Sequence, residues 1–344
     1  MNSPLLEKQQ ALLADSLQGK TIAVSGATGL VGRAVVRYLM SLNDIHQADI
    51  SVVALCRDVE KWNQTNPVIS ERTDVNAVVF EAETPFTYDG KVDYIIHAAG
   101  ISGGSKMHLK DPLKIYDIGI NGTRTLLDYA SSHGCVGFLY VSTYEIYGEV
   151  NQEDMITENH ACQLNPMVLR NSYAEVKRLC ESMLVAYHAK FGFNVYSARL
   201  TSTFGTGVSV GDPRFFAEFA RCVVSGRDIV LKSTGGTVRN YLDVDDAASA
   251  FLYILAYGET CQAYNLTNRN NAVSVRDIAQ RLIELNGSKV KLVFDIAEDV
   301  STLGFRKEGV TKMDPSKIEA IGWSPVYTLD ETLVKLSEVF KTEK

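Results

Sequence analysis

The amino-acid sequence predicts an α/β fold in which a doubly wound parallel sheet is followed by a smaller C-terminal α/β lobe. The first observation is an alternation of short β-rich apolar runs with longer segments of helical periodicity. The second is a glycine-punctuated turn that joins the first of these runs to the helical segment after it. The third is size, because 344 residues that are 46% hydrophobic can bury a large core over one or two domains.

The predicted elements follow in the order that such a sheet requires. Residues 1–19 are predicted to form a helical extension, with leucines at helical spacing, that packs on the domain or on a second subunit. The predicted strands are 21–25, 50–56, 94–98, 137–142 and 194–200, and the predicted helices among them are 31–42, 121–133 and 173–190. Buried strands that alternate with helices are typical of a parallel sheet covered on both faces.

The alternation loosens from residue 202 onward. Loops are expected around 205–213, with helices over 215–225 and 274–286. No repeat or low-complexity linker sets this part of the chain apart. We therefore predict one domain over 20–200 and a smaller lobe over 201–344 that is interleaved with it.

Composition argues against several classes of protein. A formal net charge of -7 without a basic run argues against a nucleic-acid partner. Residues 1–20 lack the features of a signal peptide, and no run approaches the roughly 18 apolar residues that span a bilayer, so we expect a cytoplasmic protein with no membrane partner. The six cysteines lie far apart without a C-x-x-C motif, which argues against a disulfide framework and a metal site.

Residues 26–32 read Gly-Ala-Thr-Gly-Leu-Val-Gly between a predicted strand and a predicted helix. Glycines permit a tight turn and close backbone approach to a pyrophosphate, and the helix N-terminus supplies N–H groups for the anion. A purely structural glycine turn is the alternative. The context favours a Rossmann NAD(P)-binding domain over 20–200. Its predicted contacts in this turn are Gly26, Thr28, Gly29, Leu30, Val31 and Gly32.

The end of the second predicted strand bears on the choice of cofactor, because an acidic residue there binds the ribose 2′-hydroxyl and a basic one accommodates a 2′-phosphate. This strand ends in Arg57, which is followed by Asp58. Arg57 favours non-covalently bound NADP over NAD, although Asp58 could turn inward and accept a ribose hydroxyl. Arg57 could equally be a solvated surface charge.

Tyr173 and Lys177 are four residues apart and therefore lie on one face of a predicted helix. Tyrosine is a poor base at neutral pH, but a nearby cation and the positive nicotinamide ring stabilise the phenolate and lower its pKa. Tyr173 could then take the proton from a substrate hydroxyl while hydride leaves for the cofactor. The alternative is a solvated helix face, where such pairs are common.

Hydroxyls and a carboxylate gather where the strand over 137–142 ends, at the edge where parallel sheets bind ligands. Thr143 could hydrogen-bond the reacting oxygen, and Glu145 could face the same substrate as a second acid or base. Alternatively, Ser142 and Thr143 could cap the next segment, and Glu145 could be an exposed loop carboxylate.

These motifs, in this order, resemble the extended short-chain dehydrogenase/reductases. The likeness spans about residues 20–340 and includes the strand end at 95–100, Asn121-Gly122-Thr123, Arg199-Leu200, residues 204–207, residues 239–247 and Tyr264-Asn265-Leu266. The resemblance implies a homodimeric enzyme that acts on a nucleotide-diphosphate sugar and whose lobe over 201–344 binds the substrate. The residues that it implies are Thr143, Glu145, Tyr173 and Lys177 for catalysis, Tyr173, Lys177, Ala98, Ala99 and Gly100 for cofactor contacts, and Ser102, Thr143, Ser202 and Arg239 for substrate contacts.

Arg239 is the residue that we expect to bind the nucleotide pyrophosphate, since a planar guanidinium suits paired phosphate oxygens. Its structural alternative is an ion pair with Asp243 or Asp245.

Within the family, Ser-Thr-x-Glu-x-Tyr-Gly over 142–148 resembles the nucleotide-sugar 4,6-dehydratases and the UDP-glucuronate decarboxylases. Residues 169–178 look most like the decarboxylase branch and related capsule-sugar enzymes. This likeness implies transient oxidation at sugar C4 and then dehydration, with Glu145 as the base at C5, or decarboxylation or epimerisation, for surface polysaccharide or modified-sugar biosynthesis. Three positions depart from the pattern. Tyr144 replaces the acid that would protonate a leaving hydroxyl, Ser202 replaces a common asparagine, and Phe204 replaces the usual tyrosine.

Two other functions stay open. An NADPH-dependent reductase of a nucleotide-linked keto sugar would fit Arg57 and would give Glu145 no obligatory role. A non-catalytic dinucleotide-sensing Rossmann protein would have no need of Thr143, Tyr173 and Lys177, so their presence argues against it.

Overall fold

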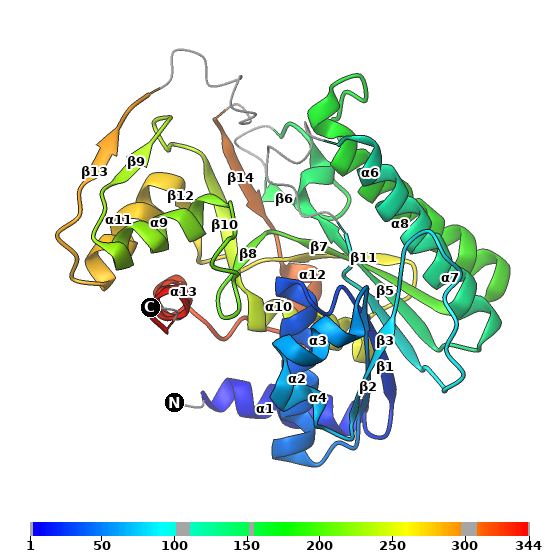
Figure 1. The fold of residues 1–344 in the computed structure, drawn as a ribbon. Coiled ribbons are helices and arrows are strands. Elements are labelled where there is room, and N and C mark those ends of the chain that lie inside the picture. Colours follow the sequence, from blue (N-terminus) through cyan, green and yellow to red (C-terminus); the bar gives the residue numbers. More distant parts are fainter. Residues whose placement is uncertain (1–2, 101–110, 151–154, 297–307, 343–344) are drawn as a thin grey trace.

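The computed structural model describes residues 3–100, 111–150, 155–296 and 308–342. Its main sheet has seven strands in the order β11-β7-β5-β4-β1-β2-β3, and every neighbouring pair is parallel (Figure 1). The strands are β1 (Thr21–Ser25), β2 (Ser51–Cys56), β3 (Val75–Val79), β4 (Tyr94–His97), β5 (Gly137–Thr143), β7 (Asn194–Leu200) and β11 (Gln262–Leu266). The chain runs outward from β1 to β3 and then crosses to β4 on the other side of β1, which confirms the doubly wound α/β prediction.

Both faces of the main sheet are covered by helices because its strands are apolar on both sides. One core packs Ile22 and Val24 with α1 (Pro4–Ser16), α2 (Leu30–His46) and α10 (Val244–Tyr257). The opposite core packs Ala23 and Ile95 with α7 (Gly122–Ser132) and α8 (Ser172–Phe191). The short helices α3 (Val59–Thr65) and α4 (Pro67–Ser70) follow β2, and α6 (Leu113–Tyr116) precedes α7.

The N-terminal helix α1 packs within this subunit, against α2 and α10. The Gln9 side chain donates to the Ser324 carbonyl at 2.7 Å, and both Leu13 and Leu17 are fully buried. Helix α2 continues four residues beyond its predicted end, because the Asn43 side chain pairs with the backbone of Ile50 and holds the last turn against the next strand.

A second group of strands forms the smaller lobe. A five-stranded sheet orders β12-β10-β14-β6, with β8 paired to β10, and a two-stranded sheet pairs β13 with β9. The strands are β6 (Met155–Ile156), β8 (Ser202–Phe204), β9 (Ile229–Leu231), β10 (Val238–Asp243), β12 (Ala272–Ser274), β13 (Leu292–Phe294) and β14 (Val310–Met313). The helices are α9 (Phe215–Ser225), α11 (Val275–Leu285), α12 (Ser316–Ala320) and α13 (Leu329–Thr342).

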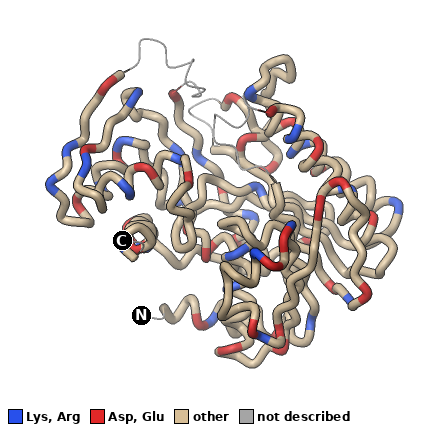
Figure 2. The backbone as a smooth tube through the Cα atoms, viewed as in Figure 1, with Lys and Arg blue, Asp and Glu red and all other residues tan. Residues whose placement is uncertain are grey.

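The chain passes between the two parts more than once. β6 precedes β7 in the chain but belongs to the second sheet. β11 follows β8, β9 and β10 of the smaller lobe but belongs to the main sheet. Charged side chains also connect the parts, because Arg37 of α2 and Lys335 of α13 both bind Asp245, each at 3.0 Å. Figure 2 shows positive and negative residues interspersed over the described parts of the chain. No helix in the described ranges has both the length and the hydropathy to cross a membrane.

Candidate active site

The glycine turn lies between β1 and α2, at the carboxyl edge of the main sheet (Figure 1). Gly26 has a φ of 70°, and a Cβ there would lie 2.8 Å from the Ala99 backbone nitrogen. A Cβ on Gly32 would lie 2.3 Å from the Gly26 carbonyl oxygen. Only glycine fits at these two positions, since no real Cβ approaches backbone atoms that closely.

Gly29 is the N-cap of α2 and supplies no capping side chain, so the N–H groups of the first helical turn point outward with no partner from a cap. The backbone cradle and the helix N-terminus together fit the pyrophosphate of a dinucleotide. Arg33, which directly follows the third glycine, adds a cation here that the sequence interpretation missed. Its guanidinium donates to the Thr28 carbonyl at 3.0 Å.

Arg57 and Asp58 follow β2 and differ in their surroundings. The Asp58 carboxylate caps α3 by accepting the Lys61 backbone N–H at 2.9 Å, so it is already occupied rather than turned toward a ribose. Arg57 is exposed and forms no hydrogen bond or ion pair with the described residues. This arrangement leaves the Arg57 side chain available to a ligand at the end of β2.

Tyr173 and Lys177 lie in the first turns of α8, a helix that packs against β5 and β7. The buried Lys177 ammonium donates to the Val141 carbonyl at 2.7 Å and lies 5.9 Å from the centre of the Tyr173 ring. A Cβ on Gly100, beyond the end of β4, would lie 3.7 Å from the same ammonium. The structure therefore brings together Tyr173, Lys177 and the strand end that contains Gly100.

The electrostatics of this pair differ from the sequence expectation. Burial raises the pKa of Tyr173 above its ordinary value, and the Glu145 carboxylate raises it further, while a hydrogen bond with Thr143 lowers it. Burial also lowers the pKa of Lys177 to about 8. In the protein alone, loss of solvation therefore outweighs the nearby cation, and the lower pKa expected with the nicotinamide ring in place stays a prediction.

Glu145 lies in a short 3₁₀ helix, Tyr144–Tyr147, that directly follows β5. Its two carboxylate oxygens accept from the Arg170 guanidinium at 2.9 and 3.3 Å, and only 13% of its side chain is exposed. It is therefore not an exposed loop carboxylate. Thr143 does cap this helix, because its hydroxyl accepts the Glu145 N–H at 3.3 Å.

Arg239 projects from β10 of the smaller lobe toward the 3₁₀ helix after β5. Its guanidinium donates to the Tyr144 hydroxyl at 2.6 Å. The alternative of an ion pair with Asp243 or Asp245 is wrong, because Lys335 binds both carboxylates and Arg37 binds Asp245. Of the other expected substrate contacts, Ser202 lies on β8 opposite Tyr241 of β10, whereas Ser102 lies outside the described residues.

The model of the NAD dependent epimerase/dehydratase family matches residues 22–267. The chain belongs to this family. UDP-glucuronic acid decarboxylase 6 from Arabidopsis thaliana is 25% identical over 93% of this chain and 88% of its own. Among solved structures, UDP-glucuronic acid 4-epimerase from Bacillus cereus, in complex with UDP-glucuronic acid and NAD, is 17% identical with a TM-score of 0.77, over 94% of this chain and all of its own. RMD from Pseudomonas aeruginosa, complexed with NADPH, is 20% identical with a TM-score of 0.71, over 94% and 100%.

As a member of this family, the chain is an enzyme with a nicotinamide dinucleotide cofactor, and the homologues act on nucleotide sugars. The cradle around Gly26 and Gly32 is the structural feature of this chain that fits such a cofactor. In the ranges that the structure describes, no group of three or more His, Cys, Asp and Glu side chains is arranged to hold a metal ion.

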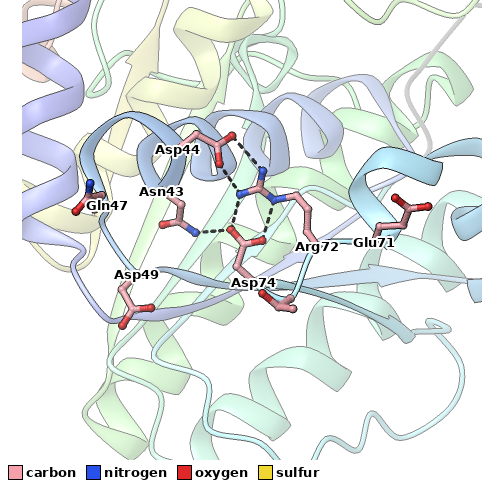
Figure 3. Close-up of a pocket in the computed structure, with 8 residues that line it drawn as sticks. Asn43, Asp44, Gln47, Asp49, Glu71, Arg72 and Asp74 are labelled. Carbon is pink, nitrogen blue, oxygen red and sulfur yellow. Dashed lines mark hydrogen bonds and ion pairs between the residues drawn. The ribbon is translucent and has the colours of Figure 1, made fainter.

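A surface depression at the opposite edge of the main sheet is lined mostly by polar and acidic residues. In it, Arg72 is held between the carboxylates of Asp44 and Asp74, and the Asn43 amide also reaches Asp74 (Figure 3). These side chains come from the end of α2 and from the segment that leads into β3. The depression therefore lies away from the glycine turn and from Tyr173.

Proposed function

We propose that this enzyme decarboxylates a nucleotide-linked uronic acid through a transient 4-keto sugar. The observation that carries the proposal is the set of groups at residues 143–145. Thr143 and Glu145 lie beside Tyr173, whereas the residue between them is a tyrosine that is bound to Arg239. The similarity to UDP-glucuronic acid decarboxylases over 93% of the chain supports the same reaction.

Position 144 separates decarboxylation from 4,6-elimination. Elimination expels a hydroxyl and therefore needs an acid that protonates it. A phenol stands at position 144 where the dehydratase pattern has a carboxylic acid, and its hydroxyl accepts from the Arg239 guanidinium. The bidentate Arg170 guanidinium favours the ionised form of Glu145 over its acid form. Decarboxylation expels CO2 and needs no such acid, so it is the reaction that these side chains favour.

The chemistry begins at the C4 hydroxyl of the sugar. We propose that Tyr173 removes the hydroxyl proton and that the Thr143 hydroxyl holds the same oxygen, while the Lys177 cation stabilises the phenolate. A dinucleotide held by the cradle around Gly26 and Gly32 would supply the hydride acceptor for oxidation at C4 and the hydride donor for its reversal. A carboxylate on C5 is then β to a ketone, so its bonding electron pair passes to the C4 oxygen as CO2 leaves. A proton added at C5 completes the replacement of the carboxylate by hydrogen. Arg239 would bind the pyrophosphate of the substrate throughout the reaction.

The preferred cofactor is proposed to be NADP, with Arg57 on the 2′-phosphate. Substituting Arg57 with alanine is expected to weaken NADP binding about 10- to 100-fold, the usual cost of a lost hydrogen bond to a charged group. NAD binding should change little. The two affinities are measured by titrating the protein with each dinucleotide in its fluorescent, reduced form. Lys61→Ala on the adjacent helix is the control. Equal affinities before and after the Arg57 substitution would identify this residue as a solvated surface charge.

We also propose the roles of the two parts, the assembly and the location. Residues 20–200 would hold the cofactor, and 201–344 would hold the nucleotide sugar. Exposed apolar side chains on α8, Leu179 and Val185, support a homodimer, which light scattering can measure. All six cysteines are free thiols, in keeping with a reducing cytoplasm.

Mass spectrometry of the products tests the proposed reaction. The purified protein is incubated with NAD or NADP and a panel of UDP-, dTDP-, GDP- and CDP-linked hexoses and hexuronates. The proposal predicts loss of CO2 from a hexuronate without net cofactor consumption. Loss of water, or an unchanged mass with an altered retention time, would instead indicate dehydration or epimerisation. A gain of two hydrogens with NADPH consumption would establish a keto-sugar reductase, a function that Arg57 also fits. No reaction with any sugar of the panel would favour a non-catalytic dinucleotide sensor.

A further inference from the structure

We infer that Arg170 is a positioning residue, which holds the Glu145 carboxylate and thereby sets the pH at which Tyr173 can act as a base. The inference deepens the proposed function, because it depends on Tyr173 being the group that exchanges a proton with the substrate. Arg170 precedes Tyr173 by three residues, in the segment that leads into α8.

Among the described residues, the Arg170 side chain hydrogen-bonds to Glu145 alone. Two guanidinium nitrogens donate to the two oxygens of Glu145, and both side chains are mostly buried, with 24% and 13% of their surfaces exposed. Paired contacts of this kind fix the rotamers of both side chains. Glu145 is therefore anchored from the α8 side, while its backbone N–H donates to the Thr143 hydroxyl on β5.

The charged and titratable groups around Tyr173 come from four elements, and β5 contributes the buried Tyr140 phenol. The 3₁₀ helix after β5 contributes the Glu145 carboxylate and the Tyr144 phenol, which both disfavour a phenolate. The segment before α8 contributes the Arg170 guanidinium, which favours it, and α8 itself contributes the Lys177 ammonium beside the ring. Neighbouring Thr143 favours the phenolate through its hydrogen bond.

Arg170 and Glu145 therefore act on Tyr173 with opposite signs. With both present, the guanidinium that touches the carboxylate offsets part of its effect on Tyr173, and the Glu145 effect is the larger of the two. Removing Arg170 alone would leave a largely buried anion close to the phenol, which would raise the pKa of Tyr173. Removing Glu145 alone would lower it. Removing both would take away the larger, raising effect as well as the smaller, lowering one, so the pKa would fall to or below its value in the parent.

Ultraviolet difference titration of the protein saturated with oxidised dinucleotide tests this directly. The phenolate absorbance is followed from pH 6 to pH 10, and the signal of Tyr173 is isolated by subtracting Tyr173→Phe in each background. The variants are Arg170→Met, Arg170→Lys, Glu145→Gln and the Arg170→Met/Glu145→Gln double variant. Arg178→Met is the matched control, since Arg178 pairs with Glu175 on α8 at a more exposed position.

We expect Arg170→Met to raise the Tyr173 midpoint by about one to three pH units and Glu145→Gln to lower it. The double variant should bring it down to the parent value or below, Arg170→Lys should shift it less than Arg170→Met, and the control should not move it. An unshifted midpoint in Arg170→Met, or a double variant that stays as high as Arg170→Met, would overturn the inference. If the parent shows no Tyr173 step at all, the proposed role of Tyr173 as a base fails together with the inference, even where product analysis finds decarboxylation.

Discussion

Replacing Tyr173 with phenylalanine is expected to lower turnover about 10²- to 10⁴-fold, the usual contribution of a positioned acid or base. The substitution removes one hydroxyl from a side chain that contacts Thr143 and lies beside Lys177, and it leaves the ring in place. Cofactor binding and the free energy of unfolding should therefore change little. Steady-state kinetics with the reacting sugar, together with dinucleotide titration, measure both effects.

The matched control is Tyr187→Phe, on the same helix as Tyr173. The Tyr187 hydroxyl is hydrogen-bonded to Asp128 on the neighbouring α7, so this variant also loses a hydroxyl and a partner. It should retain parental turnover. If Tyr173→Phe stays within a few-fold of the parent, Tyr173 is not the acid or base of the reaction.

Gly26→Ala is expected to abolish dinucleotide binding and to destabilise the fold by about 3 kcal/mol or more. Two costs combine at this position. The backbone has a φ of 70°, which L-residues adopt at a penalty, and the added methyl group would lie 2.8 Å from the Ala99 nitrogen. Relief of that contact would push β1 and the end of β4 apart, at the place where the cofactor is expected to lie. Chemical denaturation and cofactor fluorescence report the two effects.

Gly134→Ala separates the two costs. Gly134 has a nearly equal φ of 68°, but a Cβ there would meet no atom within 4 Å beyond its chain neighbours, so only the conformational penalty applies. We expect it to lose about 1 kcal/mol of stability and to bind the cofactor normally. Equal losses of stability in the two variants would contradict the close approach of backbone at Gly26.

Much of the fold follows from local sequence signals. The strand over 194–200 and the helix over 215–225 have the predicted bounds, and a glycine marks one end of each, with Gly192 before the strand and Gly226 after the helix. The Gly26 turn was also predictable, since the Gly-x-x-Gly-x-x-Gly spacing is interpretable once a strand precedes it and a helix follows it. The proximity of Tyr173 and Lys177 needed only the helical repeat.

Contacts between distant segments were not predictable in the same way. The Arg170–Glu145 pair joins residues 25 apart, and the Arg239–Tyr144 hydrogen bond joins residues 95 apart, on β10 and on the 3₁₀ helix after β5. No periodicity encodes such pairs, so the sequence suggested Asp243 and Asp245 for Arg239 merely because they are close along the chain. The raised pKa of Tyr173 was missed for a related reason, because burial is a property of the folded protein.

The most direct test of the central claim, a transient ketone at C4, uses a nucleotide-linked uronic acid that carries deuterium at C4. The substrate is the hexuronate that reacts in the product assay, and the position of the label in the product is determined by NMR. Oxidation at C4 predicts that the deuterium leaves C4 and returns to it, so that the decarboxylated product keeps the label there while C5 gains a hydrogen from solvent. Decarboxylation with no isotope effect of the C4 deuterium on the rate and no transient reduced cofactor at 340 nm would contradict oxidation at C4.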